Sequence, residues 1–426
     1  MSGFSSLNDY VDEFKILTNM KKLNIKSLAL FAGIVSSALL TSCDRSDDMM
    51  QEEKTLTKTI TVENVVTPKK FVQSGSFRGQ DNPPIMPGES TTFKFHAAKN
   101  QRLMFITMYG ASADWFFAPD HGGIQLYDEQ GRAITGDVSN QIKLWDNGSK
   151  LTKTETEDAN ISEVQEVTAS SLLKVSLAYD EATSEFTATI TNTSNTDAQH
   201  TTGFSPGVFA VSNFNGAELI EKMPFFTPNQ KSNPEVTAIA EGGNIDPLLS
   251  MVQENTGIIT GISPVLVVLY SGDHNPIFMP GQKDNGIGLK EVAQSGNSTK
   301  LMESLKKMSN VQDVFVLGTA PVGPGQKVMK TFTAKEGCKI AYVTMFGFSN
   351  DWFYANETGI PVTLRGNITS LTGLYDDGTA ADQYPGAGNK QAVFMGTSAP
   401  ESKAIEMVGN MYPVPAVSEV LKITLQ

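Results

Sequence analysis

Acidic residues that could act together occur in two stretches of the sequence, each opened by an aspartate directly before a tryptophan. The first stretch contains Asp114 and Asp146, and the second contains Asp351, Asp376, Asp377 and Asp382. Neighbouring carboxylates can bind a divalent cation through their oxygens, cap turns by accepting backbone N–H groups, or serve as the acid and base of a glycosidase. These three chemistries are the open alternatives.

Other catalytic signals are missing from the sequence. The four histidines are scattered and form neither a His-x-His nor a His-Glu-x-x-His pattern, and no phosphate loop, nucleophile elbow or cofactor fingerprint is present. The Asp-Trp unit occurs twice, which fits a repeated structural site better than one catalytic pair. We therefore predict that the protein is not an enzyme.

Composition narrows the class of protein further. The chain has 426 residues and a formal net charge of −13, so nucleic acid is not an expected partner. Hydrophobic residues make up 40% and charged residues 19%, which is typical of a folded chain. Two cysteines exclude a disulfide framework.

The N-terminal region has the pattern of a targeting signal. Lysines follow Met20, an apolar run covers residues 28–40, and residues 40–43 (LTSC) resemble a bacterial lipobox. The resemblance implies cleavage before Cys43 and acylation of that residue, which anchors a protein to a membrane. We therefore predict a signal region over residues 1–42, with Met20 as the true start. A plain secretory signal or an uncleaved anchor is the alternative.

Residues 43–55 are predicted to be an acidic linker. Residues 44–48 (DRSDD) resemble the surface-export signal of Bacteroidetes-type lipoproteins, although a solvated linker would have the same composition. The expected location is therefore the outer membrane, with the protein exposed at the cell surface. With Cys43 acylated, Cys338 remains alone and is expected to be a small packing residue.

The rest of the chain is an internal repeat. Residues 102–117 (RLMFITMYGASADWFF) recur 237 positions later as residues 339–354 (KIAYVTMFGFSNDWFY). Residues 59–62 (TITV) recur as residues 189–192 (TITN), only 130 positions later. The second copy must therefore contain an insertion, at about residues 197–310. The predicted domains are residues 56–182 and residues 183–426.

Short alternating segments predict a mainly β protein made of two antiparallel β-sandwiches. The insertion is itself duplicated. A strand-like segment that begins with Ser-Pro occurs at residues 204–211 and 262–269, and each is followed by a stretch of short helices broken by Gly-Asn.

The repeated motifs resemble the spondin N-terminal domain. They are residues 112–116 (SADWF) with 144–149 (LWDNGS), residues 349–353 (SNDWF) with 374–379 (LYDDGT), and residues 240–244 (AEGGN) after Ser205-Pro206. The resemblance implies a sandwich related to C2 domains, found in matrix and adhesion proteins, with calcium at one edge. Lys150 and Ala380 depart from the family, which often has an acidic residue at that position. The family that the repeated motifs resemble has one Ser-Pro segment in each complete domain, so we expect one of the two to pack against the first copy.

The predicted calcium ligands follow from this resemblance. They are Asp351, Asp376, Asp377 and Asp382 in the second domain, and Asp114 and Asp146 in the first. Calcium takes six to eight oxygen ligands, and close carboxylates repel one another unless a cation neutralises them. The second domain is therefore the better candidate, and turn capping remains the alternative in both.

The expected function is that of a cell-surface lipoprotein with two spondin-like calcium-binding modules, used for adhesion or ligand binding. Its expected partners are a membrane, through the lipid, and an extracellular protein or glycan. The alternatives are an outer-membrane hydrolase or glycan-handling accessory protein, and a scaffold subunit of a surface complex.

The lipid anchor can be tested directly. Cys43→Ala removes the thiol that would be acylated, so the variant should move from the membrane pellet to the soluble fraction after cell fractionation. Continued sedimentation of the variant with membranes would contradict the lipobox interpretation.

Overall fold

The computed structural model describes residues 54–79, 84–120 and 122–426. The predicted signal region 1–42, Cys43 and nearly all of the linker 43–55 lie outside the described residues. Within the described part of the chain, no helix is both long and apolar enough to cross a membrane.

The chain folds into two antiparallel β-sandwiches, as predicted. Sandwich one consists of a seven-stranded sheet and a four-stranded sheet. The larger sheet has the order β2 (Phe71–Phe77), β12 (Phe204–Ser212), β4 (Arg102–Tyr109), β5 (Trp115–Pro119), β8 (Ile142–Asp146) and β9 (Ser162–Glu163), with β6 (Ile124–Gln125) paired to β4. The smaller sheet has the order β3 (Ser90–His96), β11 (Glu185–Asn192), β10 (Leu173–Asp180) and β7 (Gly136–Asp137).

Sandwich two repeats this arrangement. Its larger sheet has the order β14 (Val311–Leu317), β13 (Val265–Tyr270), β16 (Lys339–Met345), β17 (Trp352–Ala355), β20 (Gly373–Asp376) and β21 (Glu406–Met407), with β18 (Ile360–Pro361) paired to β16. Its smaller sheet has the order β15 (Lys327–Lys335), β1 (Thr55–Asn64), β22 (Leu421–Leu425) and β19 (Gly366–Asn367).

Helices cover the outer face of each larger sheet. They are α2 (Pro234–Gly242) and α3 (Asp246–Glu254) on sandwich one, and α4 (Leu289–Ser295) and α5 (Thr299–Leu305) on sandwich two. The single-turn helices are α1 (Ala169–Leu172), α6 (Val417–Val420), η2 (Ser139–Gln141), η3 (Ser194–Thr196), η4 (Thr369–Leu371) and η5 (Ala392–Phe394). Because the larger sheets are covered on both faces, strand β13 is buried at every position, whereas β11 alternates.

The two Ser-Pro segments are divided between the sandwiches, which confirms that one of them packs against the first copy. Strand β12 pairs with β2 and β4, and β13 pairs with β14 and β16. Both serines make the same contacts: Ser205 Oγ accepts from the N–H of Met108 at 2.9 Å, and Ser263 Oγ accepts from the N–H of Met345 at 2.9 Å. The repeated Thr-Met and Ser-Pro motifs therefore join neighbouring strands.

The Gly-Asn pairs end the first helix of each segment. Gly243 and Gly296 have φ values of +65° and +71°, so each closes its helix in the left-handed conformation. A Cβ atom on either glycine would lie within 2.8 Å of the Cβ of Ser205 or Ser263. Glycine is therefore required twice over, by backbone conformation and by the close approach of the helix to the Ser-Pro strand.

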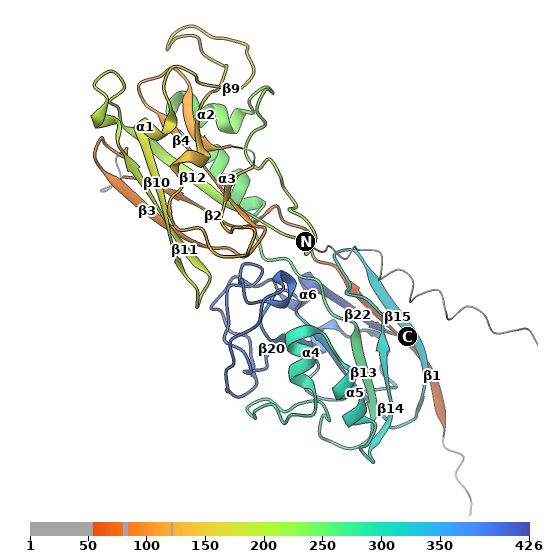
Figure 1. Cartoon of the computed structure of the whole chain (residues 1–426). Helices are drawn as coiled ribbons and strands as arrows, with labels where there is room; N and C mark the ends of the chain where they lie inside the picture. The colour runs from red at the N-terminus through yellow and green to blue at the C-terminus, as the bar shows by residue number, and fades with distance from the viewer. Residues whose placement is uncertain (1–53, 80–83, 121) are drawn as a thin grey trace, which may run out of the picture. The chain divides into compact units, whose positions relative to one another are not determined.

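The sandwiches do not follow the predicted copies 56–182 and 183–426. Strand β1 pairs with β15 and β22 of sandwich two, and β11 pairs with β3 and β10 of sandwich one. Figure 1 shows the orange β1 beside the cyan β15. The predicted boundary falls in the short turn of the β10–β11 hairpin, which keeps both strands in one sheet. Sandwich one is therefore inserted between β1 and β13 of sandwich two.

Two chain segments, residues 65–70 and 255–264, connect the sandwiches, and we call them the crossing segments. They lie side by side: the N–H of Phe71 donates to Asn255 O at 3.0 Å, and the N–H of Gly257 donates to Phe71 O at 2.9 Å. Asn213 Nδ2 donates to Lys69 O and to Gly257 O, both at 3.0 Å. The two crossing segments are thus tied to each other where they meet sandwich one.

This strand order predicts which fragments fold. A fragment of residues 50–182 lacks β11 and β12, which contribute the fully buried Phe186, Ile190, Val208 and Val211. Burying each such side chain is worth about 1.5–3 kcal/mol, comparable in sum with the stability of a domain. The fragment should therefore be unfolded by circular dichroism, whereas a fragment of residues 65–260 should unfold cooperatively. A sharply melting, monomeric 50–182 fragment would contradict the strand assignment.

Candidate metal centre

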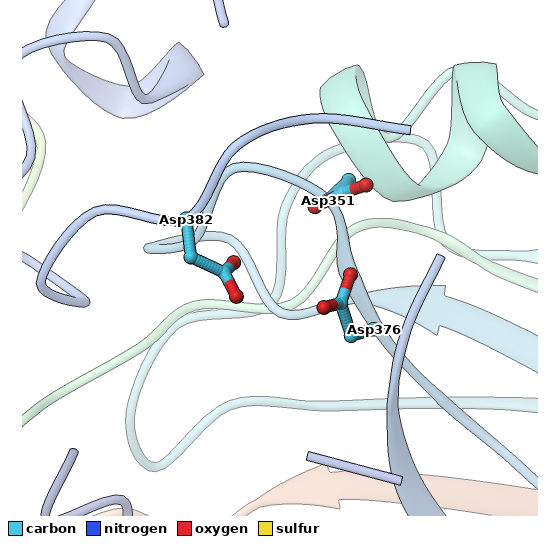
Figure 2. A group of neighbouring side chains, drawn as sticks. All are labelled: Asp351, Asp376 and Asp382. Carbon is cyan, nitrogen blue, oxygen red and sulfur yellow. The ribbon is translucent and has the colours of Figure 1, made fainter. Parts of the chain in front are cut away.

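Three aspartates of sandwich two converge at the edge of its larger sheet. Asp351 directly precedes β17, Asp376 ends β20, and these strands pair with Trp352 opposite Asp376. Asp382 arrives from the loop after β20. One carboxylate oxygen of each residue lies within 4.8 Å of the other two, and Figure 2 shows the three carboxylates pointing into a common space. The described residues contain no other such group of three potential ligands.

Asp351 anchors this arrangement. Its Oδ2 accepts from the backbone N–H groups of Thr379 at 2.7 Å and Ala380 at 2.8 Å, and Thr379 Oγ1 lies 3.0 Å away. The aspartate is completely buried, and its Oδ1 has no hydrogen-bond partner among the described residues. One oxygen therefore fixes the loop after β20, and the other is left for a ligand.

The local motifs hold this anchor in place. Ser349 Oγ accepts from the N–H of Trp352 at 3.0 Å and closes the turn that carries Asp351. Asp376 Oδ1 accepts from the N–H of Gly378 at 2.8 Å, and Gly378 has a φ of +68°. The turn-capping alternative thus describes what one oxygen of Asp351 and one oxygen of Asp376 do, and leaves Asp351 Oδ1 without a partner among the described residues.

Asp377 lies beside the group of three and is oriented differently. Its Oδ2 is 2.9 Å from Thr379 Oγ1, and its buried Oδ1 has no partner among the described residues. Apart from burial, the charge of Asp284 contributes most to raising the pKa of Asp377. Of the four aspartates predicted here, the structure therefore brings together Asp351, Asp376 and Asp382, and leaves Asp377 at the side.

Burial and mutual repulsion make these carboxyl groups hard to ionise. Burial, helped by the charge of Asp376, raises the pKa of Asp351 to about 7 and that of Asp382 to about 8. Burial also raises the pKa of Asp376, and raises that of Asp377 to about 8. Strongly shifted carboxyl groups that face one another are typical of functional sites. The donor set, three carboxylates with an unpartnered buried oxygen, fits a hard divalent cation.

Sandwich one contains the same frame with fewer ligands. Asp114 Oδ2 accepts from the N–H groups of Ser149 at 2.9 Å and Lys150 at 2.8 Å, and its Oδ1 is buried without a partner among the described residues. Asp146 Oδ1 accepts from the N–H of Gly148 at 2.8 Å, and its Oδ2 accepts from Trp115 Nε1 at 3.2 Å. Both oxygens of Asp146 are therefore in use, and no third carboxylate joins this pair among the described residues.

Two charged residues that the sequence analysis did not select also act on the cluster. Beyond the effect of burial, the charge of Glu401 raises the pKa of Asp376, and Lys403 opposes it. Glu401 and Lys403 form an ion pair with 2.7 Å between Oε1 and Nζ. Both follow the long loop after Asp382, so their distance along the chain concealed them. Their counterparts in sandwich one are Glu157 and Ala159. The N–H groups of these two residues donate to Ser149 O and Gly148 O, as those of Glu401 and Lys403 donate to Thr379 O and Gly378 O.

Comparisons with known proteins add little to this description. No family model matches the chain, and no curated protein matches it. One solved structure, the tandem C2 domains of extended synaptotagmin 2, covers 92% of this chain and 97% of that chain with 9% identity and a TM-score of 0.10. A TM-score this low gives no basis for transferring a fold or a function.

The raised pKa values predict how stability depends on pH in the presence of a chelator. The folded protein holds protons on Asp351 and Asp382 up to about pH 7–8, whereas in the unfolded chain aspartate loses its proton near pH 4. Stability should therefore fall as the pH rises from about 4 to 8. The melting temperature should decrease over this range, and Asp382→Asn should flatten the slope. An equal slope in the wild type and the variant would contradict the described electrostatics.

Proposed function

We propose that sandwich two binds a calcium ion through Asp351, Asp376 and Asp382. The observation that carries the proposal is the convergence of one carboxylate oxygen from each of three residues within 4.8 Å of one another, together with the complete burial of Asp351, whose Oδ1 has no hydrogen-bond partner among the described residues. Burying a carboxylate without a compensating partner is costly, and a divalent cation would remove that cost and the mutual repulsion together. Ligands from two strand ends and a long loop form an irregular set, which suits calcium better than magnesium.

Sandwich one is proposed to bind calcium weakly or not at all. Asp146 already uses both oxygens, and Asn147 stands where sandwich two has Asp377. Lys150 Nζ also lies at this edge, 3.5 Å from Glu241 Oε2. A neutral or cationic side chain in these places lowers the negative charge that would attract a cation.

We further propose that the protein is a non-enzymatic surface lipoprotein that uses its two spondin-like sandwiches for adhesion or ligand binding. The support for this part comes from the lipobox-like residues 40–43, the acidic stretch after them and the resemblance of the repeated motifs. The cluster itself supports a structural cation, since Asp351 also holds the loop after β20 through two backbone N–H groups. If the intact protein bound no member of a panel of matrix proteins and glycans, the proposed role in adhesion would be contradicted.

The calcium site is tested by matched variants. Asp376→Asn keeps an oxygen for the N–H of Gly378 and removes one charge, so it should abolish calcium binding measured by calorimetric titration. In the wild type, calcium at a hundred times the dissociation constant should stabilise the fold by about 2.7 kcal/mol, and a chelator should lower the melting temperature accordingly. The variant should lose this response.

Asp146→Asn is the control, because it makes the same change at the equivalent position of sandwich one. Its melting temperature should still respond to calcium as that of the wild type does. An identical melting temperature of the wild type in calcium and in chelator would mean that these aspartates only cap turns.

A further inference from the structure

The loop that carries Asp382 differs in length between the two sandwiches. In sandwich two it covers residues 381–399, between the bridged residues Ala380 and Pro400. In sandwich one the corresponding bridge joins Lys150 and Thr156, so only residues 151–155 lie between them. We call residues 381–399 the bridging loop, because it contacts both sandwiches.

One end of the bridging loop belongs to the cation cluster. Asp382 contributes a carboxylate to the group of three. The next residue, Gln383, is attached to the same edge, since its N–H donates to Asn350 Oδ1 at 2.9 Å. Asn350 directly precedes Asp351 in the turn before β17, so the position of Gln383 depends on the geometry around the cluster.

The side chain of Gln383 reaches sandwich one. Its Nε2 donates to Ser184 Oγ at 3.0 Å and to Ala182 O at 3.0 Å. Both partners lie in the turn between β10 and β11. Ser184 Oγ also accepts from the N–H of Asn389 at 2.9 Å. Ser184 and Gln383 are 0% and 2% exposed, so these polar contacts are shielded from water.

Further contacts extend along the loop. Gln101 Nε2 of sandwich one donates to Gly386 O at 2.9 Å, and the ring of Tyr384 stacks on His96 with 5.0 Å between centroids. Gln391 makes the loop one unit, since its Nε2 donates to Tyr384 O at 2.9 Å and its Oε1 accepts from the N–H of Gly386 at 3.1 Å. The N–H of Gly386 also donates to Phe348 O of sandwich two at 2.8 Å, so a shift of Asp382 would first reach the contacts that its neighbour Gln383 makes with sandwich one.

The bridging loop is separate from the crossing segments. A cavity of about 1010 Å³ is lined by Ile259 and Gly261 of one crossing segment and by Ala392 and Val393 of the loop. The sandwiches are thus joined by two covalent crossings that lie together and by a non-covalent contact across a cavity. Only the non-covalent contact can be released without breaking the chain.

We propose that cation binding at Asp351, Asp376 and Asp382 controls the contact between the two sandwiches through the bridging loop. The inference rests on the proposed calcium site. The bound cation holds Asp382 against Asp351 and Asp376, which places Gln383 and Asn389 on Ser184. Without the cation, and at a pH at which the three carboxyl groups are ionised, they repel one another, Asp382 moves away, and the contacts with Ser184 are lost.

Thermodynamic linkage allows the proposal to be tested by changing Ser184, which lies in sandwich one and outside the cation cluster. If the cation strengthens the contact, the contact must strengthen cation binding by the same factor. Ser184→Gly removes the hydroxyl and suits the φ of +58° at this position. It should weaken calcium binding by about fivefold or more, the usual size of such coupling. Gln383→Ala removes the other side of the same hydrogen bond and should have a similar effect.

The controls are matched substitutions, to glycine and to alanine, of residues that lie outside the contact. Thr183→Gly changes the exposed neighbour in the same turn, and Gln165→Ala removes an exposed glutamine of sandwich one. Both should bind calcium as the wild type does. In parallel, hydrogen exchange of the full chain should slow at residues 181–186 and 383–391 when calcium replaces chelator.

The outcomes separate the two proposals. Calcium binding by the wild type with unchanged exchange at both segments, and with unchanged affinity in Ser184→Gly and Gln383→Ala, would overturn the coupling and leave the calcium site intact. Absence of calcium binding by the wild type would overturn both. Weaker binding in the two contact variants, with normal binding in the two controls, would support the coupling.

Discussion

The buried carboxylate of Asp351 is the interaction on which the edge of sandwich two depends. One oxygen receives two backbone N–H groups from residues 379–380 and so decides where the chain goes after β20. The other oxygen receives nothing from the described residues. A half-satisfied charge in a buried position is expensive, so the frame that orders the loop also creates a demand for positive charge. The structural role and the proposed cation-binding role therefore belong to the two oxygens of one side chain.

The fold class could be predicted from the sequence because its signals are local. Alternation in β11 and continuous apolar runs such as β13 report how many faces of a strand are buried, and Gly243 and Gly296 report where a helix must end. The partner of β1 could not be predicted in the same way. Residues 59–62 and 189–192 are equivalent in the repeat, and equivalence does not say in which sandwich a strand pairs. The first repeat copy has no Ser-Pro segment and the second has two, and this was the sequence signal that strands of one copy pair in the sandwich of the other.

The candidate site was predictable to a similar extent. Repeated motifs identified Asp351 and Asp376 because strand pairing places Trp352, the residue after Asp351, opposite Asp376. Asp376 and Asp377 could not be separated, since the geometry after a strand end depends on the turn that Gly378 allows. Glu401 and Lys403 come back to the cluster only because the bridging loop returns to the same edge, and loop paths have no periodicity from which to predict them.

The two sandwiches show how one frame can lead to different chemistry. In both, an aspartate before tryptophan accepts the same pair of backbone N–H groups. In sandwich one, Trp115 occupies the second oxygen of Asp146, Lys150 brings a positive charge, and the short loop brings no third carboxylate. In sandwich two, the longer loop brings Asp382 into the cluster and Gln383 against the other sandwich. The longer loop therefore adds both a carboxylate and a contact, and it does so through two residues that are adjacent in the chain.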